Sequence, residues 1–168
     1  MAPETSRTLD LILAFLSDVE VPVREGIVPA DAVLPGVLVS RGELVIDRAA
    51  IRWPGDLLHE AGHIAVTPAD HRVELDGALE SSNQAPHSGE VEATAWAYAA
   101  IVHLGLDPAV LFHEGGYHGQ SQSLIQTFSL GVYPGAFGLA QAGMTAVGAE
   151  AERMGGPTYP RMRRWLRA

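Results

Sequence analysis

The hydrophobic positions in the first third of the chain follow two different periods. Residues 8–16 carry apolar side chains at the i, i+3, i+4 and i+7 spacing, which predicts an amphipathic helix with one buried face. Two β-rich runs follow at 37–39 and 44–46, separated by the turn-forming residues Ser40-Arg41-Gly42-Glu43. This pattern predicts a β-hairpin with a four-residue turn, in a small sheet that residues 21–23 would extend.

Two longer helices are predicted by the residues at their ends. Pro54 opens a helix over 54–66, which stops before Pro68. Ser88 caps a second helix over 89–104, which Gly105 ends. The connection between these helices is long and polar, and residues 72–75 within it can pair as a strand.

The remaining pattern is helical. It predicts a short helix near 108–114, an apolar segment over 121–130 and an alanine-rich segment over 134–153. Together these elements predict an α+β fold in a single domain over residues 1–168. We expect a small antiparallel sheet packed against helices, with a core at about 37–108 and a helical C-terminal part at 109–168.

The composition limits the chemistry that this chain can perform. It has 7 histidines and neither cysteine nor lysine. Thiol nucleophiles, cysteine-based metal sites, Schiff-base lysines and P-loop lysines are therefore excluded. A transition metal would need imidazole and carboxylate ligands, a set that suits zinc in a catalytic site.

The net charge of −9 divides unevenly, with −14 on residues 1–152 and +5 on residues 153–168. The acidic body repels phosphate, so we expect no nucleic-acid partner. No segment has the ~18 apolar residues of a spanning helix or the features of a signal peptide, so we expect no membrane partner and a cytoplasmic location. The basic segment 161–167 is either a solvated helix end or a segment that docks onto the body or a partner subunit, and a homo-oligomer is compatible with it.

The predicted helix over 54–66 contains His59-Glu60-Ala61-Gly62-His63, an HExxH motif. Two histidines four residues apart lie on one helical face about 6 Å apart, so both imidazoles can reach one zinc ion. Glu60 lies beside them, where its carboxylate can take a proton from a zinc-bound water and pass it to a leaving amine. The alternative is a pair of partly buried histidines that hydrogen-bond to their neighbours.

Catalytic zinc needs a third protein ligand. The next helix begins with two carboxylates, Glu90 and Glu92, which point to different faces because residues two apart lie about 200° apart around a helix. Glu92 shares a face with Trp96, whereas Glu90 shares one with Ala93 and Ala97, whose small side chains allow close packing against the first helix. Spacing alone does not choose between the two.

A hairpin, an HExxH helix and a second helix beginning Glu90-x-x-Ala93-Thr94-x-Trp96-Ala97 resemble the zincin metallopeptidases of the ImmA/IrrE type. The resemblance covers roughly residues 37–108. It implies a zincin-like fold, Zn²⁺ as cofactor and, by the match to the family's Glu-x-x-Ala-Asn-x-Phe-Ala, Glu90 as the third ligand beside His59 and His63. Threonine replaces the asparagine of that pattern here, and tryptophan replaces the phenylalanine.

A second cluster over 113–118 offers a further group. Tyr117 or His118 can polarise the scissile carbonyl oxygen from the side opposite Glu60, a role that zincins often give to tyrosine or histidine. The alternative is a helix end with His113 near the negative end of the dipole, followed by glycine as a stop signal.

The sequence therefore predicts an enzyme, a zinc metallopeptidase acting on a protein or peptide substrate. His59, His63 and Glu90 would hold zinc, and Glu60 would be the general base and then the general acid. The alternatives are a non-catalytic zincin-fold module that retains zinc for binding or regulation, and a zinc hydrolase of small molecules. An intact Glu60 favours catalysis, because a binding role would not need a base beside the ligands.

Overall fold

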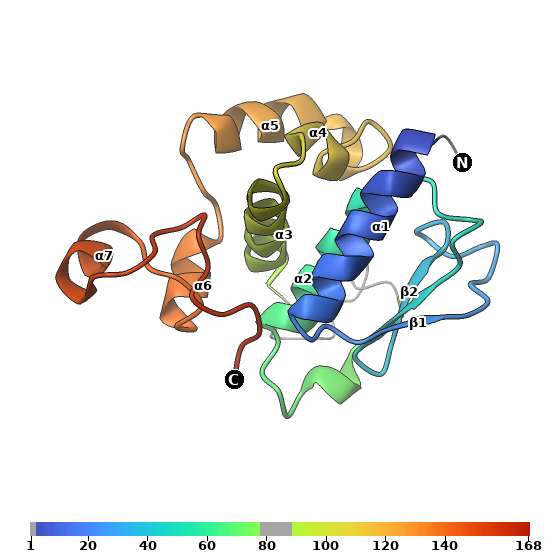
Figure 1. The fold of residues 1–168 in the computed structure, drawn as a ribbon, viewed down its shortest axis with the longest axis horizontal. Coiled ribbons are helices and arrows are strands. Elements are labelled where there is room, and N and C mark those ends of the chain that lie inside the picture. The colour runs from blue at the N-terminus through green and yellow to red at the C-terminus, as the bar shows by residue number, and fades with distance from the viewer. Residues whose placement is uncertain (1–2, 78–88) are drawn as a thin grey trace.

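The computed structural model describes residues 3–77 and 89–168. Within them the chain is α+β, as predicted: a small sheet packs on one side of α2, and α3 packs on another (Figure 1). The helices are α1 (Pro3–Asp18), α2 (Gly55–Val66), α3 (Glu90–Leu104), α4 (Pro108–Leu111), α5 (Ser121–Ser129), α6 (Ala136–Gln141) and α7 (Gly148–Met154), with the 3₁₀ turns η1 (Arg72–Glu74) and η3 (Tyr117–Gly119).

The sheet has the strand order β1-β3-β2-β4. Its strands are β1 (Val23–Glu25), β2 (Val37–Ser40), β3 (Glu43–Ile46) and β4 (Asp76–Gly77). β2 and β3 form the predicted hairpin, but its turn has two residues, because Ser40 pairs with Glu43. Arg41 and Gly42 make this turn with φ values of 52° and 77°, the left-handed conformation that tight hairpins need.

The prediction of an antiparallel sheet is wrong for β1, which pairs with β3 in parallel. The chain reverses once through residues 26–36 and again at the hairpin, so β3 returns in the direction of β1. The expected strand at 72–75 is also wrong. Residues 72–74 form η1, and the strand that pairs antiparallel with β2 is Asp76–Gly77.

Helix α2 lies at the centre of the molecule. All 12 of its residues are buried, between the sheet, α1 and α3. It ends before Pro68, as predicted, and begins at Gly55, one residue after the predicted start, with Pro54 as its N-cap. The amphipathic helix predicted over 8–16 is also confirmed within the longer α1, whose stripe of Leu9, Ile12 and Leu16 is fully buried.

The expected helical C-terminal part holds only as far as residue 154. The alanine-rich segment forms two helices, α6 and α7, because Gly143 follows α6 with a φ of 68° that a continuing helix does not adopt. Helix α3 ends at Gly105 in the left-handed conformation, as predicted, whereas the predicted cap Ser88 lies outside the described residues. Across residues 3–77 and 89–168, no helix combines the length and the apolar character needed to cross a membrane.

Residues 155–168 run back to the body of the protein without forming a helix (Figure 1). The Trp96 indole N–H donates to the carbonyl oxygen of Trp165 at 2.8 Å. The Arg167 backbone N–H donates to the Ala65 carbonyl at the end of α2 at 2.9 Å. Of the two predicted alternatives for this basic segment, docking onto the body is therefore the one observed, and backbone carbonyls and aromatic rings make the contact.

Candidate metal centre

The two histidines of the HExxH motif point the same way from consecutive turns of α2. Their Nε2 atoms lie 3.2 Å apart, and their rings meet edge to face. Both side chains are almost completely buried, with residue exposures of 3% for His59 and 1% for His63. The helix thus holds two imidazole nitrogens together inside the protein.

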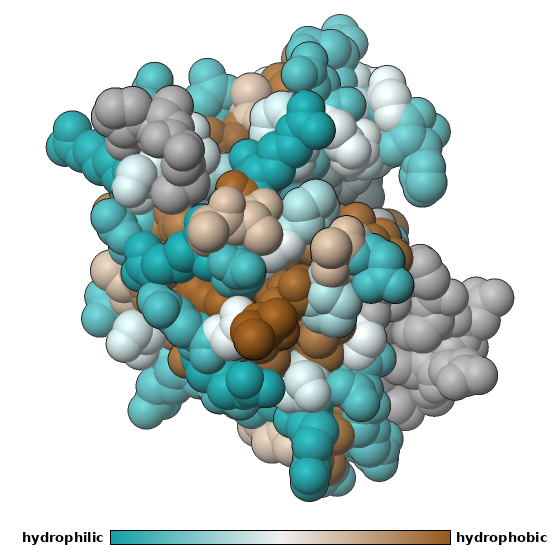
Figure 2. Space-filling view, turned by 90° about the vertical axis from the view of Figure 1, so that its right-hand side faces the viewer, coloured by the Kyte–Doolittle hydropathy of each residue, from teal (hydrophilic) through white to brown (hydrophobic). Residues whose placement is uncertain are grey.

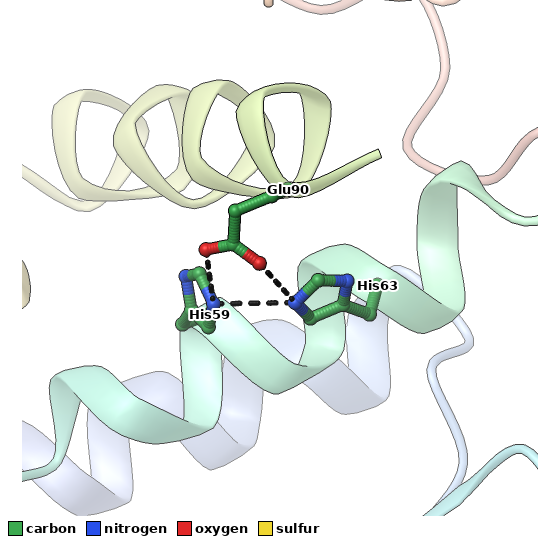
Figure 3. Close-up of side chains that lie close together, drawn as sticks. All are labelled: His59, His63 and Glu90. Atoms are coloured by element: carbon green, nitrogen blue, oxygen red, sulfur yellow. Dashed lines mark hydrogen bonds and ion pairs between the residues drawn. The ribbon is translucent and has the colours of Figure 1, made fainter. Parts of the chain in front are cut away.

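Glu90, the first residue of α3, closes the group (Figure 3). One carboxylate oxygen lies 3.2 Å from His59 Nε2, and the other lies 3.3 Å from His63 Nε2. Histidine, aspartate and glutamate side chains come close enough together to hold a metal ion at one place among residues 3–77 and 89–168, and that place is this group of three.

The geometry of this group fits a zinc ion. Zinc binds imidazole nitrogen and carboxylate oxygen at about 2.0–2.2 Å, so two ligands of a tetrahedral ion lie about 3.3–3.6 Å apart. The two imidazole nitrogens lie 3.2 Å apart, close to this range. Each of them has a different Glu90 oxygen at 3.2 or 3.3 Å, and with one ligand atom taken from each residue the three atoms lie within 4.8 Å of one another. The same donor set also suits other divalent transition metals, because imidazole binds several of them.

The electrostatics favour a carboxylate anion at Glu90. Hydrogen bonds with His59 and His63 hold the pKa of Glu90 below its usual range, although partial burial opposes this shift. The Glu90 side chain remains 56% exposed, so solvent reaches it. An ionised, accessible carboxylate beside two buried imidazoles is suited to binding a cation.

Gly62, within the motif, allows α3 to approach α2. A Cβ placed on Gly62 would lie 2.5 Å from the carbonyl oxygen of Ala93 and 3.1 Å from its Cα, so any larger residue would push the helices apart. Ala93 itself is fully buried. Ala93, one of the small residues that share a face with Glu90, therefore does pack against the HExxH helix.

Glu92 takes a different direction. Its carboxyl group lies against Gly89 and against Gly138 of α6, where a Cβ on Gly138 would come 2.3 Å from a Glu92 oxygen. The structure therefore brings Glu90, and not Glu92, to the two histidines.

Glu60 is buried on α2, with 1% of its surface exposed. It forms part of the wall of a pocket of about 190 Å³, together with residues 31–34, strand β2 and Gly77. The residue expected to act as base is thus on the sheet side of α2, next to a hollow that has mostly apolar walls.

The residues of the second predicted cluster, 113–118, lie in different surroundings in the structure. The ring of Tyr117 lies edge-on to the His59 imidazole, with centroids 5.9 Å apart, whereas His118 is exposed. His113 follows the C-cap of α4, as the helix-end alternative predicted, but it is also buried and lies 2.8 Å from the Asp56 carboxylate, a contact that the sequence pattern did not predict. The signal for this contact in the sequence is Asp56, an acidic residue that lies one helical turn before His59.

The chain matches no protein-family model, no curated protein and no solved structure. The resemblance to zincins therefore rests on the HExxH motif and on the helix that follows it. What the arrangement can do is clear from its chemistry: three converging donors can bind a divalent cation, and a buried carboxylate on the same helix can exchange protons.

Proposed function

We propose that this protein is a zinc-dependent metallopeptidase with a zincin-like fold, which hydrolyses peptide bonds of a protein or peptide substrate in the cytoplasm. The observation that carries the proposal is the convergence of His59, His63 and Glu90, whose ligand atoms lie within 4.8 Å of one another. Two imidazoles and one carboxylate form a three-ligand set that catalytic zinc sites use, with the fourth position left for water or substrate.

A zinc ion held by these residues would supply Lewis acidity toward water and toward the substrate carbonyl. The chain itself supplies proton transfer. A carboxylate oxygen of Glu60 accepts the proton of the attacking water as the water oxygen bonds to the carbonyl carbon. The same carboxyl group then donates that proton to the nitrogen of the leaving amine as the peptide C–N bond breaks.

The pocket beside Glu60 indicates the kind of substrate. Its walls include the apolar residues Ala32, Val33 and Leu34 and strand β2. Val33 and Ile27, from the same connection between β1 and β2, are exposed to solvent. Figure 2 faces the side of the molecule that carries the sheet and shows apolar surface near its centre. We therefore propose that the substrate carries an apolar side chain next to the scissile bond.

Metal binding is the first test. After loading with zinc and removal of excess metal, wild type is expected to retain about one equivalent, and His59→Ala much less, because two ligands do not hold catalytic zinc. His103→Ala is the matched control, because His103 is an exposed histidine near the other end of α3. Equal, near-zero zinc in wild type and His59→Ala would overturn the proposal.

Hydrolysis is the second test. Glu60→Gln keeps the shape of the side chain and removes its basicity, so the variant should retain zinc and lose activity by a factor of about 10²–10⁴. Peptide libraries that vary the residues flanking the scissile bond would measure the activity and the preference for apolar side chains. Undiminished hydrolysis by Glu60→Gln would show that Glu60 is not the base. Zinc binding without hydrolysis by wild type would instead favour the non-catalytic binding or regulatory module.

A further inference from the structure

A buried hydrogen bond ties the loop between α4 and η3 to the HExxH helix. His113 Nε2 lies 2.8 Å from an Asp56 carboxylate oxygen, and the side chains of the two residues are only 5% and 11% exposed. Asp56 belongs to the first turn of α2 and lies three residues before His59. The loop is therefore anchored one helical turn away from a candidate metal ligand.

The His113 ring packs closely against two neighbours. It stacks on the indole of Trp53, with centroids 4.6 Å apart and an angle of 8° between the planes. Gly116 also lies so close that a Cβ there would come 3.1 Å from His113 Cε1. The His113 backbone carbonyl also accepts a hydrogen bond from the Ser121 hydroxyl at 2.6 Å. The ring and the backbone of His113 are both fixed.

Tyr117 lies four residues after His113, at the start of η3. Tyr117 and His118 have φ values of 55° and 50°, a left-handed conformation that residues other than glycine rarely adopt. The Tyr117 ring contacts the edge or face of three other rings, those of Phe112 at 5.2 Å, His59 at 5.9 Å and His113 at 6.4 Å between centroids. An uncommon backbone conformation is thus maintained where it holds an aromatic ring against His59.

We propose that Asp56 and His113 act as positioning residues that fix the orientation of the His59 imidazole through the ring of Tyr117. The inference rests on the proposed function, because it assumes that His59 binds a metal ion. The Tyr117 ring is 88° from the plane of the His59 imidazole, so it opposes rotation of that imidazole about its Cβ–Cγ bond. Such a rotation would move His59 Nε2 away from His63 and Glu90.

Metal affinity tests the proposal without any substrate. The Kd for Zn²⁺ is measured by competition with a chromophoric chelator, on folded protein from which metal has been removed. His113→Ala and Tyr117→Ala are each expected to weaken binding by about 10–100-fold, the effect typical of groups that orient a ligand. Circular dichroism checks that each variant is folded before its affinity is compared.

Conservative variants separate positioning from a general effect on stability. In Asp56→Asn the amide oxygen still accepts a hydrogen bond from His113, and in Tyr117→Phe the ring remains, so both are expected to bind Zn²⁺ within about threefold of wild type. Thr145→Val removes a buried hydroxyl that donates to the Arg161 carbonyl at 2.7 Å. It should lower the unfolding midpoint and leave the Kd unchanged.

A second measurement reports on ligand geometry directly. With Co²⁺ in place of Zn²⁺, the visible absorption spectrum should change in His113→Ala and Tyr117→Ala and stay like that of wild type in the two conservative variants. If wild type binds zinc and the two alanine variants bind it equally well, the proposal is overturned and the proposed function stands. If wild type binds neither metal, both are overturned.

Discussion

Gly62 of α2 and Ala93 of α3 are in direct backbone contact, with space for a hydrogen atom and not for a methyl group between them. Glu90 lies three residues before Ala93, one turn nearer the start of α3. The contact therefore sets how far the Glu90 carboxylate is from His59 and His63. Because Gly62 has no side chain, α3 can lie close enough to α2 for Glu90 to reach the two histidines.

Gly62→Ala is expected to force α2 and α3 apart. Overpacking of this kind costs about 1–3 kcal/mol, which outweighs the gain of about 1 kcal/mol in helix propensity. The free energy of unfolding, measured with urea, should fall, and Zn²⁺ affinity should fall with it because Glu90 moves away from the histidines.

Gly138→Ala is the matched control for this substitution. The three atoms nearest to its new Cβ all belong to the Glu92 side chain, from Cγ to a carboxylate oxygen, and this side chain can turn away because it does not contact the two histidines through its carboxylate. Stability should change little or rise slightly, and Zn²⁺ affinity should not change. A loss of Zn²⁺ affinity in Gly138→Ala as large as that in Gly62→Ala would contradict this account of the helix contact.

Glu90→Gln and Glu92→Gln form a pair that tests the third donor. Glu90→Gln removes an ionised carboxylate that faces both histidines, so Zn²⁺ binding should weaken by more than the ~100-fold upper range for groups outside the ligand set. Glu92→Gln alters a carboxyl group that faces Gly138 and should leave the Kd close to that of wild type. Isothermal titration gives both values, and the reverse ranking would transfer the ligand role to Glu92.

Arg72 stabilises the C-terminal end of α2. Its guanidinium donates to the carbonyl oxygens of Ile64 and Thr67, each at 3.2 Å, and to that of Arg167. Arg72→Ala would leave these acceptors without this donor, at a cost of about 1–3 kcal/mol in the free energy of unfolding. Arg72→Lys keeps the charge but not the planar fork of donors, so we expect an intermediate loss. Tryptophan fluorescence during urea unfolding measures both, and an alanine variant as stable as wild type would show that water replaces the guanidinium.

Tyr159 should make the protein sensitive to alkali. Its hydroxyl donates to the Ala95 carbonyl at 2.9 Å, and burial, followed by the neighbouring tyrosines Tyr98 and Tyr133, raises its pKa well above the usual range. A raised pKa favours the protonated form in the folded state, so its contribution to stability is complete below about pH 10 and is lost as the pH rises above the value of the unfolded chain.

The measurement is the urea midpoint of wild type and Tyr159→Phe between neutral pH and about pH 11. The phenylalanine variant should be less stable by about 1 kcal/mol at neutral pH, because it lacks the hydrogen bond to Ala95. Above about pH 10 the urea midpoint of this variant should fall less steeply than that of wild type, because one ionising group is gone. Parallel declines would mean that Tyr159 does not ionise on unfolding.

Local patterns were enough to predict the central elements of the fold. Proline at both ends of the HExxH segment predicts α2, and glycine after Leu104 predicts the end of α3, because these residues act within one turn of the chain. The same spacing predicts that His59 and His63 share a helical face, and their Nε2 atoms do converge. Zinc binding and peptide hydrolysis remain predictions.

Contacts between distant segments could not be predicted in the same way. The direction of β1 depends on two chain reversals, and the hydrogen bond between Asp56 and His113 joins residues 57 apart in sequence. The choice between Glu90 and Glu92 depends on how α3 packs on α2 at Gly62. Periodicity describes which face of a helix is buried, but not which residue of a second helix meets it.

The complete burial of α2 has a thermodynamic consequence for any ion that binds there. Two of the three donors belong to a helix that tertiary packing keeps folded, so the chain entropy of arranging them is lost during folding and not during binding. Small zinc modules behave differently, because metal binding and folding are a single event in them. In this protein a chelator should remove the ion and added zinc should restore it while the fold persists.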